Sequence, residues 1–411
     1  ISCSLVGSEM CIRDRLKIAR KNSNSRYFME QTFDFDEIRP YEGEEVAAAA
    51  ERLCKEELFC KAIAYVVPDT EAFLHTLSAC RTVDDFQLQL ALPFLNALAK
   101  NTSAGLTHAG FSGLSSQGCY TYISNHRDIT LDSAFLNVVL HVNEFDTCEI
   151  AIGDNLLIYP WIVDFVRLNK SFIVNRSVSR RQMLEVSCRL SAYMHYAIRD
   201  KKQSIWIAQR EGRAKNSDDR TQESLVKMFA LSGGGDFLSN IRALNLVPVA
   251  ISYEYDPCDY LKAQEMQLKR DDVGYKKQPS DDLKNMATGI TGYKGRIHFE
   301  AASPINSLLE QIPDGTPRSE LAVAVGHIID KSIHTHYRLY PGNYAAYDEL
   351  WGEGSMSGCY TGKEKDEFDR YLQSRIDKID IPGKDESFLR ERLLEMYAYP
   401  VRNQLKACSD K

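Results

Sequence analysis

The feature that most constrains this fold is an alternation of strand-like and helix-like segments between residues 119 and 305. Short runs rich in β-branched and aromatic residues are separated by longer stretches with apolar residues every three or four positions. The strand-like segments are 119–124, 147–153, 170–176, 204–211, 246–255 and 294–305, and the helix-like segments between them include 131–142, 156–168 and 180–200. This order predicts an α/β fold with a mostly parallel central sheet flanked by helices.

The rest of the chain is expected to be mainly helical. Residues 29–105 hold strong helix formers and predict an N-terminal helical region, whereas the Gly/Ser-rich stretch 103–118 predicts a loop or linker. We expect the α/β domain to span 118–305 and a C-terminal helical extension to span 306–411. Residues 1–15, "ISCSLVGSEMCIRDR", resemble a translated sequencing-adaptor scar and are left out of the fold prediction.

Composition excludes several classes of protein. The longest apolar runs fall short of the roughly 20 residues that a membrane-spanning helix needs, so we expect a protein that is soluble or touches membranes peripherally. A net charge of −7 argues against a nucleic-acid partner. The 11 cysteines are scattered without the spacing of a zinc site, which predicts reduced thiols in the cytoplasm and no metal.

Three polar residues follow predicted strands. His126, Arg176 and Glu211 each come at or just beyond the end of a strand-like segment. Because parallel sheets place their chemistry at the carboxyl ends of strands, we expect these side chains to share one site.

The triplet His126-Arg127-Asp128 also occurs in the catalytic loop of protein kinases, so a kinase is the first alternative to test. That loop has a metal-binding Asn five residues after the Asp, where this chain has Ser133. No D-F-G, A-P-E or V-A-I-K motif is present, and the glycine-rich "GGGDF" at 233–237 lacks the Lys of a P-loop. The sequence therefore excludes a kinase.

A histidine with carboxylates close behind suits general-base chemistry instead. His126 supplies the base, and Asp128 and Asp132 are the two candidates to orient it, with Asp132 favoured because it starts the next predicted helix. A lone histidine before a helix is more often a cap or a packing residue, so this motif needs support from elsewhere. Residues 176–220 give it, because eleven Lys/Arg against five Asp/Glu form a basic island that suits a phosphate-bearing substrate.

Four blocks in order, within residues 118–305, resemble those of the glycerolipid acyltransferase family, particularly its glycerol-3-phosphate branch. They are "SNHRDITLD" (124–132), "GDNLLIYPWIVDFVRLNKSFIVNRS" (153–177), "WIAQREGRAKNSDDRT" (206–221) and "LVPVAISYEY" (246–255). The resemblance implies His126 as the general base and Pro248 on the acyl-donor side. It implies that the acceptor's phosphate is bound or oriented by Arg176, Glu211, Gly212 and Arg213.

The chain departs from the family pattern at two points. The family's box is usually H-x-x-x-x-D, but the residue five after His126 is Leu131 and the acid comes one later, at Asp132. The third block has Arg213 where the family has its first arginine, whereas Arg220 has no assigned place in the pocket. Because the aspartate is shifted by one residue, the hypothesis that this protein is a catalytically inactive lipid-binding or scaffold relative also remains.

The resemblance implies an O-acyltransferase that moves a fatty acyl group from acyl-CoA or acyl carrier protein to a phosphorylated glycerol, in phospholipid biosynthesis. The "GDNL" opening and the Tyr253-Glu254 ending favour glycerol-3-phosphate, with lysophosphatidate and a non-glycerolipid acceptor as alternatives. No cofactor or metal is expected. Because the expected substrates are lipid precursors, we expect a cytoplasmic protein that is peripheral to the inner face of the membrane. Residues 156–168 are interpreted either as a segment that lies in the membrane interface or lines an acyl groove, or as a helix packed on the sheet.

Overall fold

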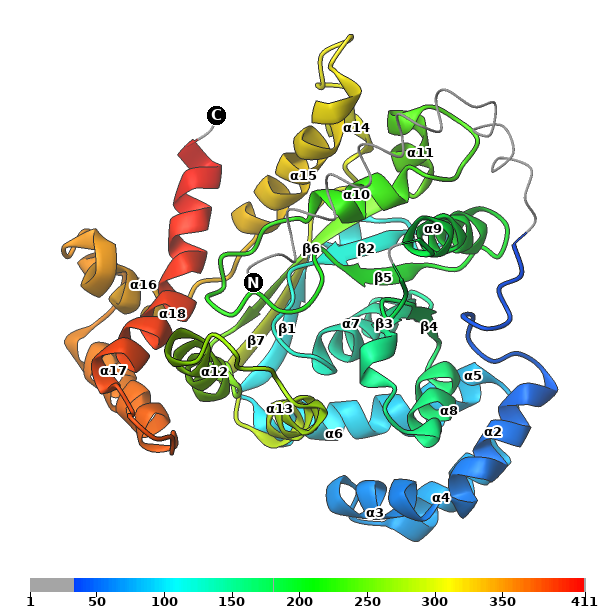
Figure 1. Ribbon diagram of the computed structural model, residues 1–411, viewed down its shortest axis with the longest axis horizontal. Coiled ribbons are helices and arrows are strands. Elements are labelled where there is room, and N and C mark those ends of the chain that lie inside the picture. The colour runs from blue at the N-terminus through cyan, green and yellow to red at the C-terminus, as the bar shows by residue number, and fades with distance from the viewer. Residues whose placement is uncertain (1–32, 180, 410–411) are drawn as a thin grey trace.

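The computed structural model describes residues 33–179 and 181–409, so the proposed scar at residues 1–15 lies outside the described residues. A seven-stranded sheet with the order β1-β7-β6-β2-β5-β3-β4 forms the centre (Figure 1). The strands are β1 (Gly105–Ala109), β2 (Thr121–Ser124), β3 (Glu149–Gly153), β4 (Ser171–Val174), β5 (Ile205–Ala208), β6 (Leu246–Tyr253) and β7 (Arg296–Ala301). Strands β6, β2, β5, β3 and β4 are mutually parallel, which confirms the α/β fold class.

One edge of the sheet was not predicted. β7 pairs antiparallel with β6, and β1 pairs parallel with β7, so these two strands run against the other five. The prediction of a loop over 103–118 is wrong for 105–109, which form β1. β1 lies at the sheet edge, and none of its five residues is fully buried. It therefore lacks the buried apolar run by which the central strands were recognised.

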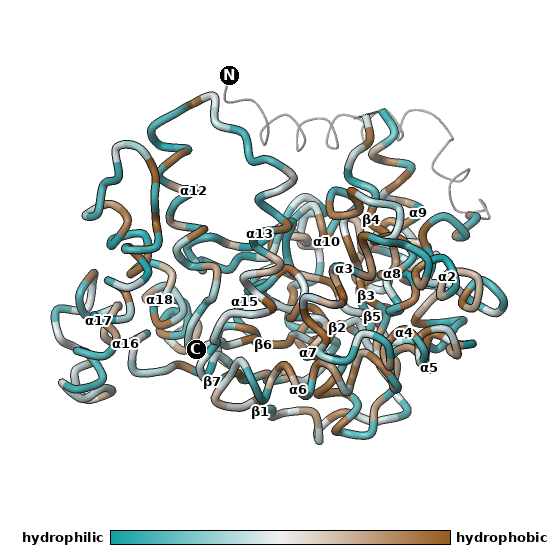
Figure 2. Tube along the Cα trace, turned by 90° about the horizontal axis from the view of Figure 1, so that it is seen from below, coloured by the Kyte–Doolittle hydropathy of each residue, from teal (hydrophilic) through white to brown (hydrophobic). Residues whose placement is uncertain are grey.

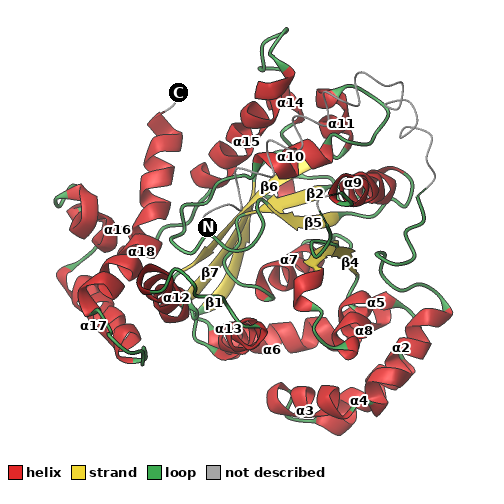
Figure 3. Ribbon diagram, viewed as in Figure 1, coloured by secondary structure: helices red, strands yellow, loops and turns green. Residues whose placement is uncertain are grey.

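Helices cover both faces of the sheet, α9, α10, α11, α14 and α15 on one face and α6, α7, α8 and α13 on the other (Figures 1 and 3). The helices are α2 (Glu44–Lys55), α3 (Glu57–Val66), α4 (Thr70–Ala79), α5 (Val83–Phe86), α6 (Leu92–Thr102), α7 (Leu131–Val142), α8 (Pro160–Leu168), α9 (Met183–Arg199), α10 (Glu223–Phe229), α11 (Phe237–Ala243), α12 (Asp259–Asp271), α13 (Pro279–Thr291), α14 (Asn306–Leu309), α15 (Arg318–Thr335), α16 (Pro341–Tyr347), α17 (Gly362–Asp377) and α18 (Glu386–Ser409).

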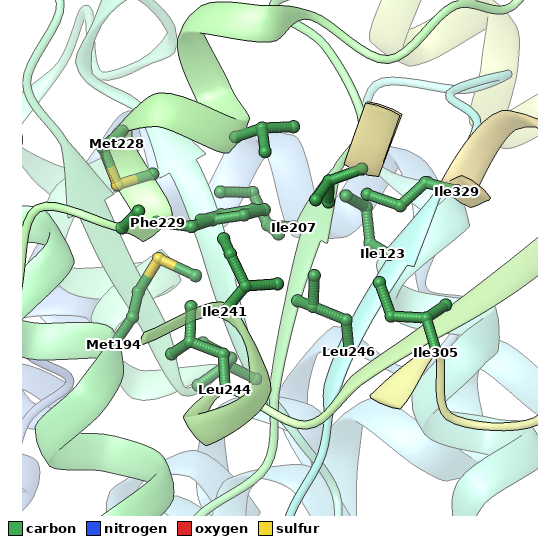
Figure 4. Packing of buried hydrophobic residues seen from close by; sticks show 14 of the residues in the cluster. Ile123, Met194, Ile207, Met228, Phe229, Ile241, Leu244, Leu246, Ile305 and Ile329 are labelled. Atoms are coloured by element: carbon green, nitrogen blue, oxygen red, sulfur yellow. The ribbon is translucent and has the colours of Figure 1, made fainter. Parts of the chain in front are cut away.

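The alternation of side chains along each strand creates two cores, one on each face. Ile123 and Ile207 pack with α9, α10 and α15 on one face, where Figure 4 shows them beside Phe229 and Ile329. Tyr122, one residue earlier, belongs to the opposite core with α6 and α7. Each of these large side chains is nearly or fully buried, which stabilises the fold by roughly 1.5–3 kcal/mol per residue.

Two further apolar clusters lie outside the sheet. α2 to α5 form one with Trp161 and Phe165 of α8, and α16 to α18 form the other with α12. Figure 2 shows hydrophobic residues gathered along the strands, with more hydrophilic residues on the outer helices such as α17. The division at residues 105, 118 and 306 stays a prediction, although α6 shares a core with the sheet. No described helix combines the length and apolar character that a membrane crossing requires.

Candidate active site

The segment that follows β2 is fixed to the neighbouring strand by a buried asparagine. Asn125 is fully buried, its side-chain nitrogen donates to the carbonyl of Ile251 at 2.9 Å, and its side-chain oxygen accepts from the Ile251 amide at 2.8 Å. These two bonds join the carboxyl ends of β2 and β6. His126, the next residue, is therefore held at a defined place on the sheet edge.

The imidazole of His126 contacts Asp132 in the first turn of α7. Its Nδ1 lies 2.8 Å from Asp132 Oδ2, which also accepts the backbone amides of Arg127 at 2.6 Å and Asp128 at 3.0 Å. The carboxylate thus closes the turn between strand and helix, and the extra loop residue is accommodated. With Nδ1–H donating to Asp132, Nε2 keeps its lone pair, which is the state of a general base.

Asp128 has a different task. Its Oδ1 accepts the amides of Thr130 and Leu131, both at 2.9 Å, so it satisfies free N–H groups at the start of α7. Burial, followed by the charge of Asp132, raises the pKa of Asp128. Among the described residues the structure places Asp132, and not Asp128, on His126. The catalytic roles of both carboxylates remain predictions.

Two aromatic residues complete the surroundings of His126. The Trp206 ring packs edge-on against the imidazole at 5.9 Å between centroids and donates from Nε1 to Ser124 Oγ at 3.0 Å. Tyr253 ends β6, and its buried hydroxyl has no hydrogen-bond partner in the described part of the chain. Burial, then the charges of Asp132 and Asp128, raise the pKa of Tyr253 well above its usual value.

The loops after β3, β4 and β5 bring Arg176 and Glu211 together. Arg176 Nη1 lies 3.8 Å from Glu211 Oε1, and the amides of Arg176 and Ser177 donate to the Asp154 carboxylate at 3.1 Å. Gly153 leaves room for the Arg176 side chain, because a Cβ at residue 153 would lie 3.1 Å from the guanidinium carbon of Arg176. The guanidinium is partly exposed, so it remains accessible to an anion.

Gly212 and Arg213 form the second basic position. Gly212 has φ +67°, a backbone conformation that suits glycine and lets a loop turn tightly. Arg213 Nη2 donates to Asn285 Oδ1 of α13 at 2.9 Å, while its Nη1 is buried without a partner among the described residues. An orphaned, buried guanidinium donor is one bond short of satisfaction and suits an incoming phosphate oxygen.

Most of the basic island is paired within the protein. Arg180 lies outside the described residues. The ion pairs involving its other members are Arg189–Glu37, Arg199–Asp200, Lys201–Glu42, Lys201–Glu149, Lys215–Glu265 and Arg220–Asp218, besides Arg176–Glu211. Three of these cations, Arg189, Lys201 and Lys215, pair with carboxylates outside residues 176–220, so about half of the excess charge counted from the sequence is neutralised within the protein. Among the described members, Arg213 is the one with a buried unpaired donor.

Pro248 lies apart from these side chains. It is a buried residue in the body of β6 and pairs in register with Ile123, three residues before His126. Its carbonyl accepts the Ala302 amide, which belongs to the segment after β7. The assignment of Pro248 to the acyl-donor side stays a prediction.

Sequence reasoning did not single out Asn125, Trp206 or Asn285, and it used Tyr253 as a sign of the acceptor rather than as a neighbour of Asp132 and Asp128. Asn125 and Tyr253 lie at the ends of strands, where a polar or aromatic residue is a signal that could have found them, whereas Trp206 lies inside β5. Asn285 had no local signal, because it reaches Arg213 across 72 residues of sequence.

Comparisons with known proteins give little further constraint. No model of a known protein family matches this sequence, and no curated protein matches it. Among solved structures, the chain is similar to the 1-acyl-sn-glycerophosphate (LPA) acyltransferase, PlsC, from Thermotoga maritima. The alignment has 10% identity and a TM-score of 0.33, and covers 70% of this chain and 93% of the other. A likeness this low supports no inference, so function is argued from the site alone.

Proposed function

We propose that this protein is an O-acyltransferase of the glycerolipid type. It moves a fatty acyl group from acyl-CoA or acyl carrier protein to the hydroxyl of a phosphorylated glycerol. The observation that supports this most is the His126–Asp132 contact of 2.8 Å at the carboxyl end of β2, with Nε2 of the imidazole available as a base. Arg213 is connected to this contact through α13, in which Asn285 accepts a hydrogen bond from Arg213 and Gly289, one turn later, lies against Asp128, the second residue after His126.

In the proposed reaction, His126 Nε2 removes the proton from the acceptor hydroxyl as its oxygen attacks the thioester carbonyl. A C–O bond forms, the C–S bond breaks, and the imidazolium returns the proton to the departing thiolate. Asp132 stabilises the imidazolium during this step, as a carboxylate does in other histidine-based sites. No metal or other cofactor takes part in this scheme.

The acceptor's phosphate is proposed to lie by Arg213, Gly212 and the Arg176–Glu211 pair. Glycerol-3-phosphate is the acceptor we favour, and lysophosphatidate, which carries the same phosphate, is the alternative. A catalytically inactive lipid-binding relative is a second possibility. The feature that favoured it was the displaced aspartate, and the His126–Asp132 contact weakens that argument.

Contact with a membrane surface from the cytoplasmic side is part of the proposal. It follows from the lipid product. α8 gives it limited support, because Trp161 and Phe165 pack against Phe59 rather than facing outward. Tyr159 and Ile158, just before α8, are exposed at 40% and 38%.

The test measures thiol release from a long-chain acyl-CoA and, separately, from acyl carrier protein, with glycerol-3-phosphate or lysophosphatidate as acceptor. Acceptor-dependent release, with the acylated product identified by mass spectrometry, would support the proposal and name the acceptor. Arg213→Gln is expected to raise the KM for the acceptor by roughly ten- to a hundredfold, because a charged hydrogen bond is lost. Arg270→Gln, an exposed arginine of α12 paired with Asp271 and Asp385, is the control. Absence of release with both donors and both acceptors would contradict the proposed activity.

A further inference from the structure

The side chain of Arg127 enters the protein interior, away from the imidazole beside it in sequence. It is 8% exposed, and its Nη2 lies 2.8 Å from Oδ2 of Asp219, which is fully buried. Two opposite charges at this distance, removed from water, attract strongly. The residue between His126 and Asp128 is thus anchored to a segment almost a hundred positions later.

Asp219 is in turn fixed by the end of α15 and the residues after it. The Tyr337 hydroxyl donates to Asp219 Oδ2 at 2.6 Å, and His334 Nε2 lies 2.8 Å from the Asp219 carbonyl oxygen. The Tyr337 ring also faces the Arg127 guanidinium carbon, 5.6 Å from the ring centroid. The aspartate therefore has little freedom to follow any movement of Arg127.

The backbone of Arg127 makes the connection to the proposed base. Its amide donates to Asp132 Oδ2 at 2.6 Å, the same oxygen that contacts His126 Nδ1. Its carbonyl accepts from Lys262 Nζ of α12 at 3.3 Å. A shift of Arg127 would move the carboxylate that orients the imidazole.

Stability alone is a weak reason for this arrangement. Arg127 Nη1 and Asp219 Oδ1 are both buried and have no hydrogen-bond partner among the described residues. A buried ion pair gains little net free energy over apolar residues, and an incompletely satisfied one gains less. What the pair does provide is a fixed position for the loop.

Asp219 also belongs to the segment that carries the proposed acceptor-binding residues. This segment leaves β5 at Gln209, whose amide donates to the Ser124 carbonyl, and returns at Gln222, whose amide donates to the Gln209 carbonyl. Glu211, Gly212 and Arg213 lie inside it. The Arg127–Asp219 pair is therefore a second tie between this segment and the His126 loop.

We infer that Arg127 and Asp219 are positioning residues, which hold His126 and Asp132 in place relative to the segment that binds the acceptor. This inference rests on the proposed function. It assigns a task to Arg127, the residue of the His126-Arg127-Asp128 triplet that neither takes part in the reaction scheme nor binds the amides at the start of α7.

A matched pair elsewhere in the chain gives the control. Arg375 Nε lies 2.5 Å from Asp259 Oδ1, their side chains are 9% and 0% exposed, and the hydroxyls of Tyr371 and Tyr397 donate to Asp259. This is again a buried Arg–Asp pair with tyrosine donors, but it joins α12 to α17. Asp219→Asn and Asp259→Asn can therefore be compared as the same chemical change at two places.

If the inference holds, both variants lower the melting temperature, but Asp219→Asn alone lowers kcat, by roughly ten- to a hundredfold, with little change in the KM for the acyl donor. Tyr337→Phe, which removes one hydrogen bond to Asp219, serves if Asp219→Asn does not fold, and should lower kcat in the same direction. Equal kcat losses in the two aspartate variants, or wild-type kcat in a folded Asp219→Asn, would overturn the positioning role.

A second readout does not depend on activity. The readout is the NMR signal of the His126 Nδ1–H proton, which is hydrogen-bonded to Asp132, in protein with ¹⁵N-labelled histidine. This signal is identified as the proton resonance that is absent from His126→Ala. It should persist in Asp259→Asn and shift or broaden in Asp219→Asn. An unchanged resonance in Asp219→Asn would refute the positioning role, whether or not the wild type shows thiol release. Absence of thiol release from the wild type would contradict the acyltransferase proposal separately.

Discussion

At the scale of single residues, three neighbours along the chain have three different hydrogen-bonding partners. His126 pairs with Asp132, Arg127 with Asp219, and Asp128 with the amides at the start of α7. The resemblance of this triplet to a kinase loop is therefore one of letters only. Each side chain is explained by what it contacts.

We predict that Asp132→Asn lowers kcat by on the order of a thousandfold or more, because the amide fails to orient the imidazole and to stabilise its charged form. Asp128→Asn should retain most activity and lose about 1 kcal/mol of stability, the typical effect of a weakened helix cap. Steady-state kinetics and urea unfolding of the two variants measure these effects. Similar kcat losses in both would show that the contact with His126 does not decide activity.

The residues of the site could be predicted only where local sequence carries the signal. His126 and Asp132 are six positions apart and flank a strand-to-helix junction, so pattern alone places them together. Arg127 and Asp219, in contrast, meet because two loops pack against α15, and no spacing within either loop reports that. The sequence left Asp128 open as an alternative partner of His126 because both carboxylates are close to it along the chain, and spacing does not tell which one faces the imidazole.

At the scale of elements, α10 to α13 were not identified from sequence patterning, and α13 is the one of them that contacts both Arg213 and Asp128. Of its described residues, Asn285 and Gly289 are the buried ones, and the apolar residues at helical spacing, Leu283, Met286 and Ile290, are only partly buried. Both residues contact the site: Asn285 accepts from Arg213, and Gly289 lies against Asp128. The helix is therefore held both by these polar and close contacts and by Ile290, which packs against the core shared with α6 and α7.

Gly289→Ala is expected to destabilise the protein by about 1–3 kcal/mol and to impair activity, because the new Cβ would lie 1.9 Å from Asp128 Oδ2. Gly326→Ala in α15 is the matched control. There the nearest atom, in Thr221, is 3.8 Å away, so better helix propensity should stabilise by roughly 0.5–1 kcal/mol. Urea unfolding and thiol release of both variants provide the measurement. A neutral Gly289→Ala would contradict the close contact of α13 with the His126 loop.

Lys294 joins α6 and the end of α13, and it predicts a pH effect. It is fully buried, and its ammonium donates to Thr102 Oγ1, the Ile290 carbonyl and the Gly292 carbonyl. Burial lowers its pKa from 10.5 to about 8. Between these two values the unfolded chain binds more protons than the folded one, so this group makes stability rise with pH.

The free energy of unfolding of the wild type relative to Lys294→Met should therefore increase from about pH 7.5 to about pH 9.5. Taking the difference between the two proteins removes the titration of groups that they share. Urea unfolding at each pH measures it. A difference that is flat or falls over this range would show that the Lys294 pKa is not depressed in the folded state.

At the scale of the whole molecule, the alternation of strands and helices predicted the sheet and its layers well. All six expected strands are present, because buried strands carry dense apolar runs. The antiparallel pairing of β6 with β7 was not predicted, since periodicity tells which face of a strand is buried but not its direction. β1 is short and has no such run, so it was interpreted as part of a loop.

The N-terminal helices are held to this body partly by Phe165 of α8, which packs against Phe59 at 5.9 Å and Phe86 at 5.6 Å between ring centroids. Phe165→Ala should lower stability by about 2 kcal/mol and hasten proteolysis within α2 to α5 before the sheet. Limited proteolysis with mass spectrometry checks this order, with Tyr65→Ala, 75% exposed, as control. Simultaneous cleavage throughout the chain would contradict it.

The central claim is that His126 acts as the base of an acyl transfer, and one measurement tests it most directly. Acceptor-dependent thiol release is compared between the wild type and His126→Ala, with circular dichroism confirming that both are folded. We predict a fall of at least about a hundredfold in the variant, the usual contribution of a general base. Release that persists in a folded His126→Ala would contradict the account.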